Sequence, residues 1–202
     1  SFDIVICGGG ISGLLATACF GLKGYNVLCV EPSKKKVNLP NDFRSTALLQ
    51  KSVAVLEQYN IWNDLVPYAT PLKTMRIVNV SEDKSSSNNF DFSSSDISEL
   101  PFGWNVSNSE IKKFLQRKIE DIPNAEILFG NSIKDIFTRS SGARVTLIDN
   151  RSVNTNFIIA ADGKNSFVRN FFKIKCRQKD FNQIGLAFTV EHSKSHKNIS
   201  TE

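Results

Sequence analysis

The sequence lacks any apolar run long enough to cross a membrane, and it begins with neither a basic leader nor a cleavage site. We therefore expect a cytoplasmic protein rather than a secreted one. Cysteine is scarce, and the four cysteines at positions 7, 19, 29 and 176 have neither metal-ligand nor C-x-x-C spacing. We interpret them as reduced residues, three of them on buried elements, as in a reducing cytosol.

Histidine is scarcer still, since the only two are His192 and His196 in a polar tail. No acid stands near them at triad or metal spacing, so neither a hydrolase triad nor a metal site is expected. The net charge of +5 is modest, and the basic run at residues 34–36 is typical of a solvated loop. Because aromatic residues do not interleave this run, nucleic-acid binding is not expected.

A strand, a glycine turn and a helix open the chain. Residues 4–7 are apolar and largely β-branched, as in a buried parallel strand. Gly8, Gly10 and Gly13 follow at the G-x-G-x-x-G spacing, in which the glycines serve a tight turn, a pyrophosphate and close helix packing, in that order. A helix over residues 11–23 would direct free N–H groups and its positive dipole end at the turn, which favours a phosphate.

A second strand completes this unit. Gly24 suits the helix C-cap, residues 25–30 predict a strand, and Glu31 stands where an acid accepts hydrogen bonds from a ribose. A glycine pattern alone is weak evidence, because glycine turns also serve ordinary packing. Strand, turn, helix and acid together predict a dinucleotide site.

Two further helices are predicted in the middle of the chain. One covers residues 45–59 with Ser45 or Thr46 as its cap, because its apolar residues recur at helical spacing. The other covers residues 108–119, with an acid in its first turn and a proline shortly after its end.

Strand patterns fill much of the remaining chain. Residues 72–80 alternate as a half-buried strand with Met75 and Ile77 facing inward, and residues 184–190 predict a last strand. Between them, a short helix is expected to bury Phe167, Val168 and Phe171. An antiparallel β-meander is predicted from four strand-like stretches, residues 125–129, 133–137, 143–148 and 153–161.

Separated motifs resemble the class A flavoprotein monooxygenases, which have the para-hydroxybenzoate hydroxylase fold. They are the glycine turn, DFRSTALLQKSV at residues 42–53 and IIAADGKNSFVR at residues 158–169. Together with GWNVSNSEIKKFL at residues 103–115, they look most like the ubiquinone-biosynthesis hydroxylases, the 2-octaprenyl-6-methoxyphenol hydroxylase family. The glycine turn is common to Rossmann-like proteins, whereas the A-D-G-x-x-S-x-x-R pattern that ends at Arg169 is narrower.

The resemblance implies an α/β fold: a Rossmann-like FAD/NAD(P)-binding domain of the para-hydroxybenzoate hydroxylase type, with an antiparallel β-meander and part of a β-rich substrate domain. We assign residues 1–71 and 101–175 to the FAD-binding domain and residues 72–100 and 176–202 to the substrate domain. Members of the family are longer and carry a second glycine–aspartate motif. We therefore interpret the sequence as an N-terminal fragment.

The resemblance also implies which residues bind the cofactor. Gly8, Gly10 and Gly13 would hold the FAD pyrophosphate, and Glu31 would bind the adenosine ribose. Arg44 matches an arginine that approaches the pyrophosphate and the ribityl chain.

Four further residues match cofactor contacts later in the chain. Asn108 lies near a polar ribityl contact, and Ile133 stands where a backbone group meets the adenine. Asp162 and Gly163 belong to the motif credited with contacts to FAD and with the use of NAD(P)H.

Several of these residues also have simpler explanations. Arg44 is compatible with a surface ion pair to Asp42, which contributes little stability. Glu31 is compatible with a strand that simply ends in solvent. The Asp162–Gly163 pair is also typical of an ordinary turn.

The activity implied by the resemblance is that of an FAD-dependent NAD(P)H:O2 monooxygenase when full length, the fragment itself being inactive. The expected substrate is a prenylated phenol or quinol in ubiquinone biosynthesis, and a lipid-tailed substrate would bring the full-length protein into peripheral contact with a membrane. Because the cofactor carries the chemistry, no catalytic residue is assigned.

Two other functions stay open at this point. One is a flavin-dependent reductase or dehydrogenase of the same superfamily, which would not hydroxylate aromatic rings. The other is a non-catalytic nucleotide-binding module, which would not turn over NADH in the presence of FAD.

Overall fold

The computed structural model describes residues 1–35, 42–80 and 87–202, so position 36 of the basic run lies outside the described residues. The chain divides into two compact units, one of Ser1–Asn41 and Ile111–Gly185 and one of Asp42–Glu110 and Leu186–Glu202. The domain boundaries expected from the sequence stay a prediction. Among the described residues, no helix has the length and apolarity that crossing a membrane requires.

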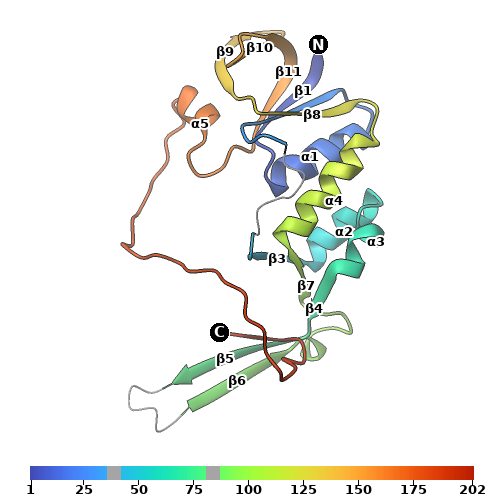
Figure 1. Ribbon diagram of the computed structural model, residues 1–202, viewed down its shortest axis with the longest axis vertical. Coiled ribbons are helices and arrows are strands. Elements are labelled where there is room, and N and C mark those ends of the chain that lie inside the picture. The colour runs from blue at the N-terminus through green and yellow to red at the C-terminus, as the bar shows by residue number, and fades with distance from the viewer. Residues whose placement is uncertain (36–41, 81–86) are drawn as a thin grey trace. The chain divides into compact units, whose positions relative to one another are not determined.

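The first unit is built on a six-stranded sheet in the order β8-β2-β1-β11-β10-β9 (Figure 1). Strands β8, β2, β1 and β11 are parallel to one another. Strand β10 pairs antiparallel with both β11 and β9, as in the predicted meander. The stretch at residues 125–129 was expected in that meander but pairs with β2 instead, at the opposite edge of the sheet. The strands are β1 (Phe2–Cys7), β2 (Val27–Glu31), β8 (Ala125–Phe129), β9 (Ile133–Arg139), β10 (Gly142–Leu147) and β11 (Ser152–Ala160).

Both faces of the central strands are covered, which explains why β1 and β2 are apolar throughout. Helix α1 (Ile11–Leu22) packs on one face, where Ala16 and Phe20 contact a core cluster. That cluster consists of Ile4, Ile6, Val27 and Cys29. The meander and Val168 of α5 (Phe167–Phe171) pack on the other face, around Val5, Cys7, Leu28, Val30, Ile136, Val145 and Leu147.

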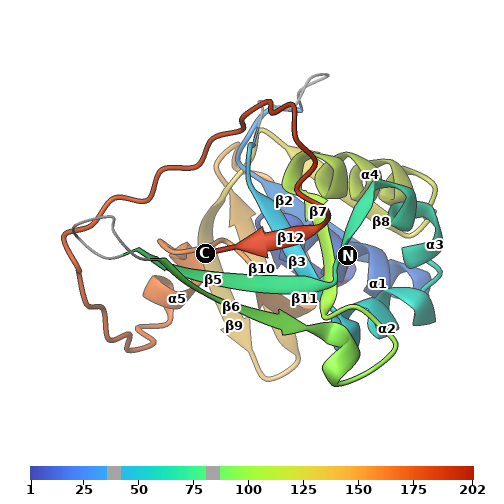
Figure 2. The ribbon, with the colours of Figure 1, turned by 90° about the horizontal axis from the view of Figure 1, so that it is seen from below.

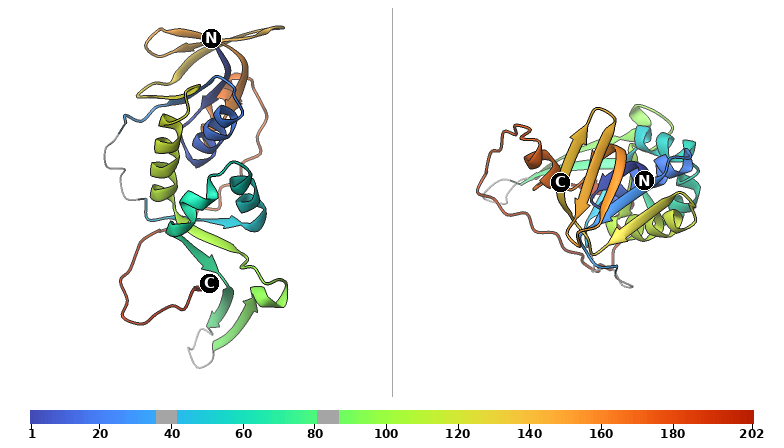
Figure 3. Two further views of the ribbon diagram at one scale, coloured as in Figure 1. Left: turned by 90° about the vertical axis from the view of Figure 1, so that its right-hand side faces the viewer. Right: turned by 90° about the horizontal axis from the view of Figure 1, so that it is seen from above.

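Helix α4 (Asn108–Glu120) forms over the residues that the sequence predicted. Side chains at four-residue spacing are buried along it, namely those of Ile111, Leu115 and Ile119. It ends three residues before Pro123, and Figure 3 shows it in two views together with the strands of the large sheet. The hydrophobic periodicity of this segment was therefore sufficient to predict the helix.

The second unit contains two three-stranded sheets (Figure 2), in the orders β3-β7-β4 and β12-β5-β6. Its strands are β3 (Ser45–Leu49), β4 (Ala69–Leu72), β5 (Thr74–Val80), β6 (Ser87–Ser93), β7 (Gly103–Ser107) and β12 (Ile199–Thr201). Its helical segments are α2 (Gln50–Gln58), α3 (Trp62–Leu65) and the 3-10 turns η1 (Val66–Tyr68) and η2 (Ser94–Asp96).

The helix predicted over residues 45–59 was wrong in its first part. Residues 45–49 form strand β3, which pairs with β7, and the helix begins only at Gln50, so neither Ser45 nor Thr46 caps it. Burial alternates along β3, because every second side chain faces the rest of the unit. The pairing with a distant strand therefore overrides the local helical spacing.

Other predictions about burial and strands were also wrong. Met75 and Ile77 are exposed on β5, and in α5 only Val168 is buried, whereas Phe167 and Phe171 are 39% and 38% exposed. Residues 184–190 form no strand, although their sequence alternates. A strand requires hydrogen bonds to a partner strand, and within the described structure residues 184–190 pair with no strand.

Replacing Leu28 by alanine tests the core of the first unit. Leu28 is 2% exposed and belongs to the cluster between the sheet and the meander. We expect Leu28→Ala to lower the free energy of unfolding by about 2–5 kcal/mol in urea denaturation followed by circular dichroism. Leu22→Ala, at a 42% exposed position of α1, is the matched control and should change this free energy by less than about 1 kcal/mol. Equal losses for the two variants would contradict this description of the core.

Candidate functional site

The glycine turn after β1 requires glycine at two positions for steric reasons. Gly8 has a φ of +102°, and a Cβ there would lie 2.5 Å from the carbonyl oxygen of Ala161. A Cβ on Gly13 would lie 1.8 Å from the carbonyl oxygen of Gly8. Helix α1 therefore approaches the end of β1 more closely than any side chain permits.

Gly10 differs from these two glycines because open space surrounds the position of its absent Cβ. Apart from Gly10 and its chain neighbours, no atom of the described residues lies within 4 Å of that position, and Gly10 is the N-cap of α1, without a side chain that caps the helix. The first N–H groups of a helix have no partner within the helix, and its dipole is positive at this end. The structure thus has room at Gly10 for a negatively charged group, and the pyrophosphate expected there from the sequence stays a prediction.

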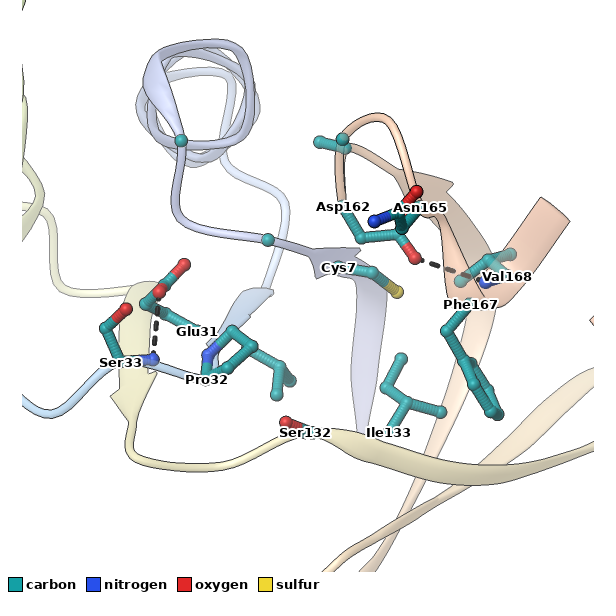
Figure 4. Close-up of a pocket in the computed structure, with 15 residues that line it drawn as sticks. Cys7, Glu31, Pro32, Ser33, Ser132, Ile133, Asp162, Asn165, Phe167 and Val168 are labelled. Atoms are coloured by element: carbon teal, nitrogen blue, oxygen red, sulfur yellow. Dashed lines mark hydrogen bonds between the residues drawn. The ribbon is translucent and has the colours of Figure 1, made fainter. Parts of the chain in front are cut away.

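Glu31 ends β2 beside the turn, and its carboxylate is held by two backbone groups. The N–H of Gly9 donates to Oε2 at 2.6 Å, and the N–H of Ser33 donates to Oε1 at 2.9 Å. Figure 4 shows the second of these bonds. Each carboxylate oxygen keeps a further lone pair for a ligand hydroxyl. The Glu31 carboxylate is therefore held in place by the backbone, unlike that of an acid at which a strand simply ends in solvent.

Asp162 follows β11 on the other side of Cys7 (Figure 4). The N–H of Val168 donates to its Oδ2 at 3.1 Å. Its Oδ1 is buried, and no atom of the described residues forms a hydrogen bond with it. A buried carboxylate oxygen without a partner is costly, so this atom indicates a donor supplied from outside the chain.

One pocket of about 490 Å³ joins these features, a volume within the range of small-molecule sites. Of the nine predicted site residues, six line it: Gly8, Gly10, Glu31, Ile133, Asp162 and Gly163. Gly13 does not line the pocket but allows α1 to approach the turn. The sequence did not single out Cys7, Ser132, Asn165 and Phe167 as lining residues, although each is within four positions of a predicted one.

The two buried thiols of this region are neutral at physiological pH. Burial, with smaller contributions from Asp162 and Cys29, raises the pKa of Cys7 to about 12. Burial also raises the pKa of Cys29 to about 11, despite a hydrogen bond with Thr17 that lowers it. A thiol with so high a pKa is a poor nucleophile, so both cysteines serve as small apolar side chains. All four cysteines are free, as predicted, although Cys176 is exposed.

Arg44 and Asn108 belong to the second unit, where both contact Asp42. The Arg44 guanidinium donates from Nε and Nη2 to the two carboxylate oxygens of Asp42, at 2.8 Å and 2.9 Å. Asn108 donates from Nδ2 to Oδ2 of Asp42 at 3.3 Å and accepts from Oγ1 of Thr46 at 2.6 Å. The hydrogen bond from Arg44 holds the pKa of Asp42 well below its usual range. The ion pair that was the simpler explanation for Arg44 is therefore present.

Comparison with known proteins gives the family context. The family described as FAD binding domain matches residues 1–201. The ubiquinone hydroxylase UbiL of Rhodospirillum rubrum is 24% identical over 202 residues, which cover 99% of this chain and 46% of UbiL. The 3-(3-hydroxy-phenyl)propionate/3-hydroxycinnamic acid hydroxylase of Paraburkholderia xenovorans is 26% identical over 86% of this chain and 28% of that enzyme. The chain thus spans less than half the length of these two relatives.

Solved structures share the fold at low sequence identity. PqsL from P. aeruginosa, in complex with 2-aminobenzoylacetate, is similar with a TM-score of 0.75 and 19% identity, over 89% of this chain and 48% of PqsL. The p-nitrophenol 4-monooxygenase PnpA from Pseudomonas putida is similar with a TM-score of 0.71 and 18% identity, over 85% of this chain and 43% of PnpA. The α/β fold predicted from the sequence, that of the FAD-binding domain of class A flavin monooxygenases, is confirmed. The chain belongs to the FAD-binding domain family of the FAD-dependent monooxygenases.

Proposed function

We propose that this chain binds FAD in the pocket of its first unit and is the cofactor-binding portion of a monooxygenase that hydroxylates a prenylated phenol or quinol in ubiquinone biosynthesis. One observation carries the cofactor assignment. The same pocket combines open space at the N-cap Gly10 with a buried, unpartnered Oδ1 of Asp162. These are the two features that a ligand with both phosphates and hydroxyl groups requires.

Each residue of the pocket has a role in this proposal. The pyrophosphate lies against the N–H groups at the start of α1, and Gly13 makes that approach possible. Glu31 accepts hydrogen bonds from the adenosine ribose, and the Asp162–Gly163 segment accepts from another hydroxyl of FAD. A backbone group at Ile133 contacts the adenine. When bound, FAD supplies the redox chemistry, and the chain binds, orients and shields it.

Arg44 and Asn108 complete the proposed set as contacts to the pyrophosphate and ribityl part of FAD. In the described structure Arg44 is paired with Asp42, and its side chain is 67% exposed. Exposed ion pairs of this kind contribute little stability, so pairing with Asp42 does not prevent Arg44 from contacting a phosphate. NAD(P)H is the proposed electron donor.

The ring-hydroxylating function rests on the family and on the relatives' activities. UbiL is named a ubiquinone hydroxylase, and the relative from Paraburkholderia xenovorans hydroxylates a phenolic acid. The test measures NAD(P)H oxidation and product mass, under ¹⁸O₂, with a prenylated phenol and with 3-(3-hydroxyphenyl)propionate as substrates. It uses this chain and the longest protein that contains it. Incorporation of one ¹⁸O atom into the prenylated ring supports the proposal, and oxidation of NAD(P)H without ring hydroxylation contradicts it.

Replacing Gly10 by alanine tests the phosphate position. The added methyl group points into open space, so the fold should persist, with a loss of about 1 kcal/mol or less in unfolding free energy. The same methyl group occupies the space that we assign to the pyrophosphate. We expect the Kd for FAD, measured by quenching of flavin fluorescence, to rise at least about tenfold.

Two other glycines provide the controls for this variant. Gly185→Ala also adds a methyl group in open space, but away from the pocket, and should leave the Kd for FAD unchanged. Gly13→Ala should destabilise the fold itself, because its Cβ would overlap the carbonyl oxygen of Gly8. A Gly10→Ala protein that binds FAD like the unmodified chain would show that the pyrophosphate lies elsewhere.

The variant Glu31→Gln tests the ribose contact. The amide keeps the shape of the side chain but has one acceptor oxygen instead of two, so it loses charge-assisted hydrogen bonds. We expect FAD binding to weaken by about 1.5–3 kcal/mol, roughly 10- to 150-fold in Kd by isothermal titration calorimetry. Glu120→Gln, at an exposed acid of the same unit, is the control and should bind FAD normally. Equal affinity of Glu31→Gln and the unmodified chain would refute the ribose assignment.

A further inference from the structure

The positive charge of this chain is concentrated in one stretch. Residues 163–179 contain six of the 25 lysines and arginines and none of the 20 aspartates and glutamates. The other residues therefore hold 19 basic and 20 acidic side chains, which nearly balance. The net charge of +5 thus originates from the stretch that begins at the Asp162–Gly163 motif and continues past α5.

Four of these cations are regularly spaced along the sequence. Lys173, Lys175, Arg177 and Lys179 occupy alternate positions after α5, in a segment without helix or strand. All four are exposed, and within the part of the chain that the structure describes none of them forms an ion pair. Their charges are therefore available to a partner.

Exposed apolar side chains stand among these cations. The rings of Phe171 and Phe172 contact each other at 5.3 Å between centroids and are 38% and 43% exposed. Ile174 is 61% exposed and Phe181 is 67% exposed, with Nζ of Lys179 at 5.0 Å from the ring centroid of Phe181. We call residues 171–181 the basic–aromatic segment. It combines positive charge with apolar groups that water does not favour.

We propose that the basic–aromatic segment binds the surface of a membrane that contains anionic lipids. Clustered lysines and arginines are attracted to anionic headgroups, and aromatic side chains prefer the interface between headgroups and acyl chains. Within the segment four cations alternate from Lys173 to Lys179, one acid follows at Asp180, and most of the other residues are apolar, so a single contact uses both kinds of side chain. Aliphatic Ile174 and the mutually packed rings of Phe171 and Phe172 fit this interface better than they fit stacking on nucleic-acid bases.

The test measures binding of the 202-residue chain to vesicles by flotation. Vesicles of 70% phosphatidylcholine and 30% phosphatidylserine should bind the chain, and vesicles of phosphatidylcholine alone should not. Raising the salt from 0.1 M to 0.5 M should weaken binding, because charge–headgroup attraction is screened. Replacing all four cations by glutamine should lower the binding constant at least about a hundredfold, since each contributes roughly fivefold.

A second quadruple variant matches this change in net charge. Glutamines at Lys51, Lys73, Lys134 and Arg139 remove four exposed cations outside the segment and should change binding by less than about threefold. The double variant Phe172→Ser with Ile174→Ser should abolish the binding that remains at 0.5 M salt. Circular dichroism establishes that each variant is folded.

Three results would overturn the proposal. One is equal binding to vesicles with and without phosphatidylserine, which needs no variant to observe. Another is an equal loss of vesicle binding in the two quadruple variants, which would show that net charge alone causes the binding. The third is binding of a 20-nucleotide single-stranded RNA that is tighter than vesicle binding, which would assign the segment to nucleic acid instead.

Discussion

The close approach of helix α1 to the end of strand β1 is the constraint on which the pocket depends. It exists because Gly13 presents no side chain to the carbonyl oxygen of Gly8, which would lie 1.8 Å from a Cβ. Gly8 in turn permits the end of β11 to approach, since its own Cβ would lie 2.5 Å from the carbonyl oxygen of Ala161. The end of β1, the start of α1 and the sequence-distant end of β11 therefore meet at one point, and the helix N-terminus at Gly10 faces the space between them.

The electrostatics of the pocket follow from this geometry. Unpaired N–H groups and the helix dipole favour an anion at Gly10, whereas Glu31 and Asp162 place two acids at the pocket walls. Acids repel a phosphate but accept hydrogen bonds from hydroxyl groups. The pocket therefore separates a region for phosphate from regions for hydroxyls, as a dinucleotide requires. The neutral thiols of Cys7 and Cys29 add no charge to this arrangement.

The sequence predicted the parts of the fold that local patterns determine. The first βαβ unit and α4 form where glycine spacing and helical periodicity indicated them. Strand β3 was missed because its apolar residues also match a helical spacing, and only pairing with β7 decides between the two. Residues 184–190 alternate like a strand, yet alternation does not provide the partner edge that a strand needs.

For the candidate site as well, the sequence predicted what local patterns determine. Gly8, Glu31 and Asp162 line one pocket because they stand at the ends of the parallel strands β1, β2 and β11, and such ends meet at one edge of a sheet. From the sequence, the pairing of Arg44 with Asp42 was only an alternative and the missing partner of Asp162 Oδ1 was not indicated, because both depend on side-chain positions, which no spacing determines.

The most direct test of the account is a competition experiment in which FAD bound to this chain is displaced by ADP or by riboflavin. ADP carries the diphosphate and ribose that we assign to the pocket, and riboflavin carries neither. The account predicts that ADP displaces FAD and that riboflavin at the same concentration does not. Displacement by riboflavin but not by ADP would contradict the assignment of the glycine turn to the pyrophosphate.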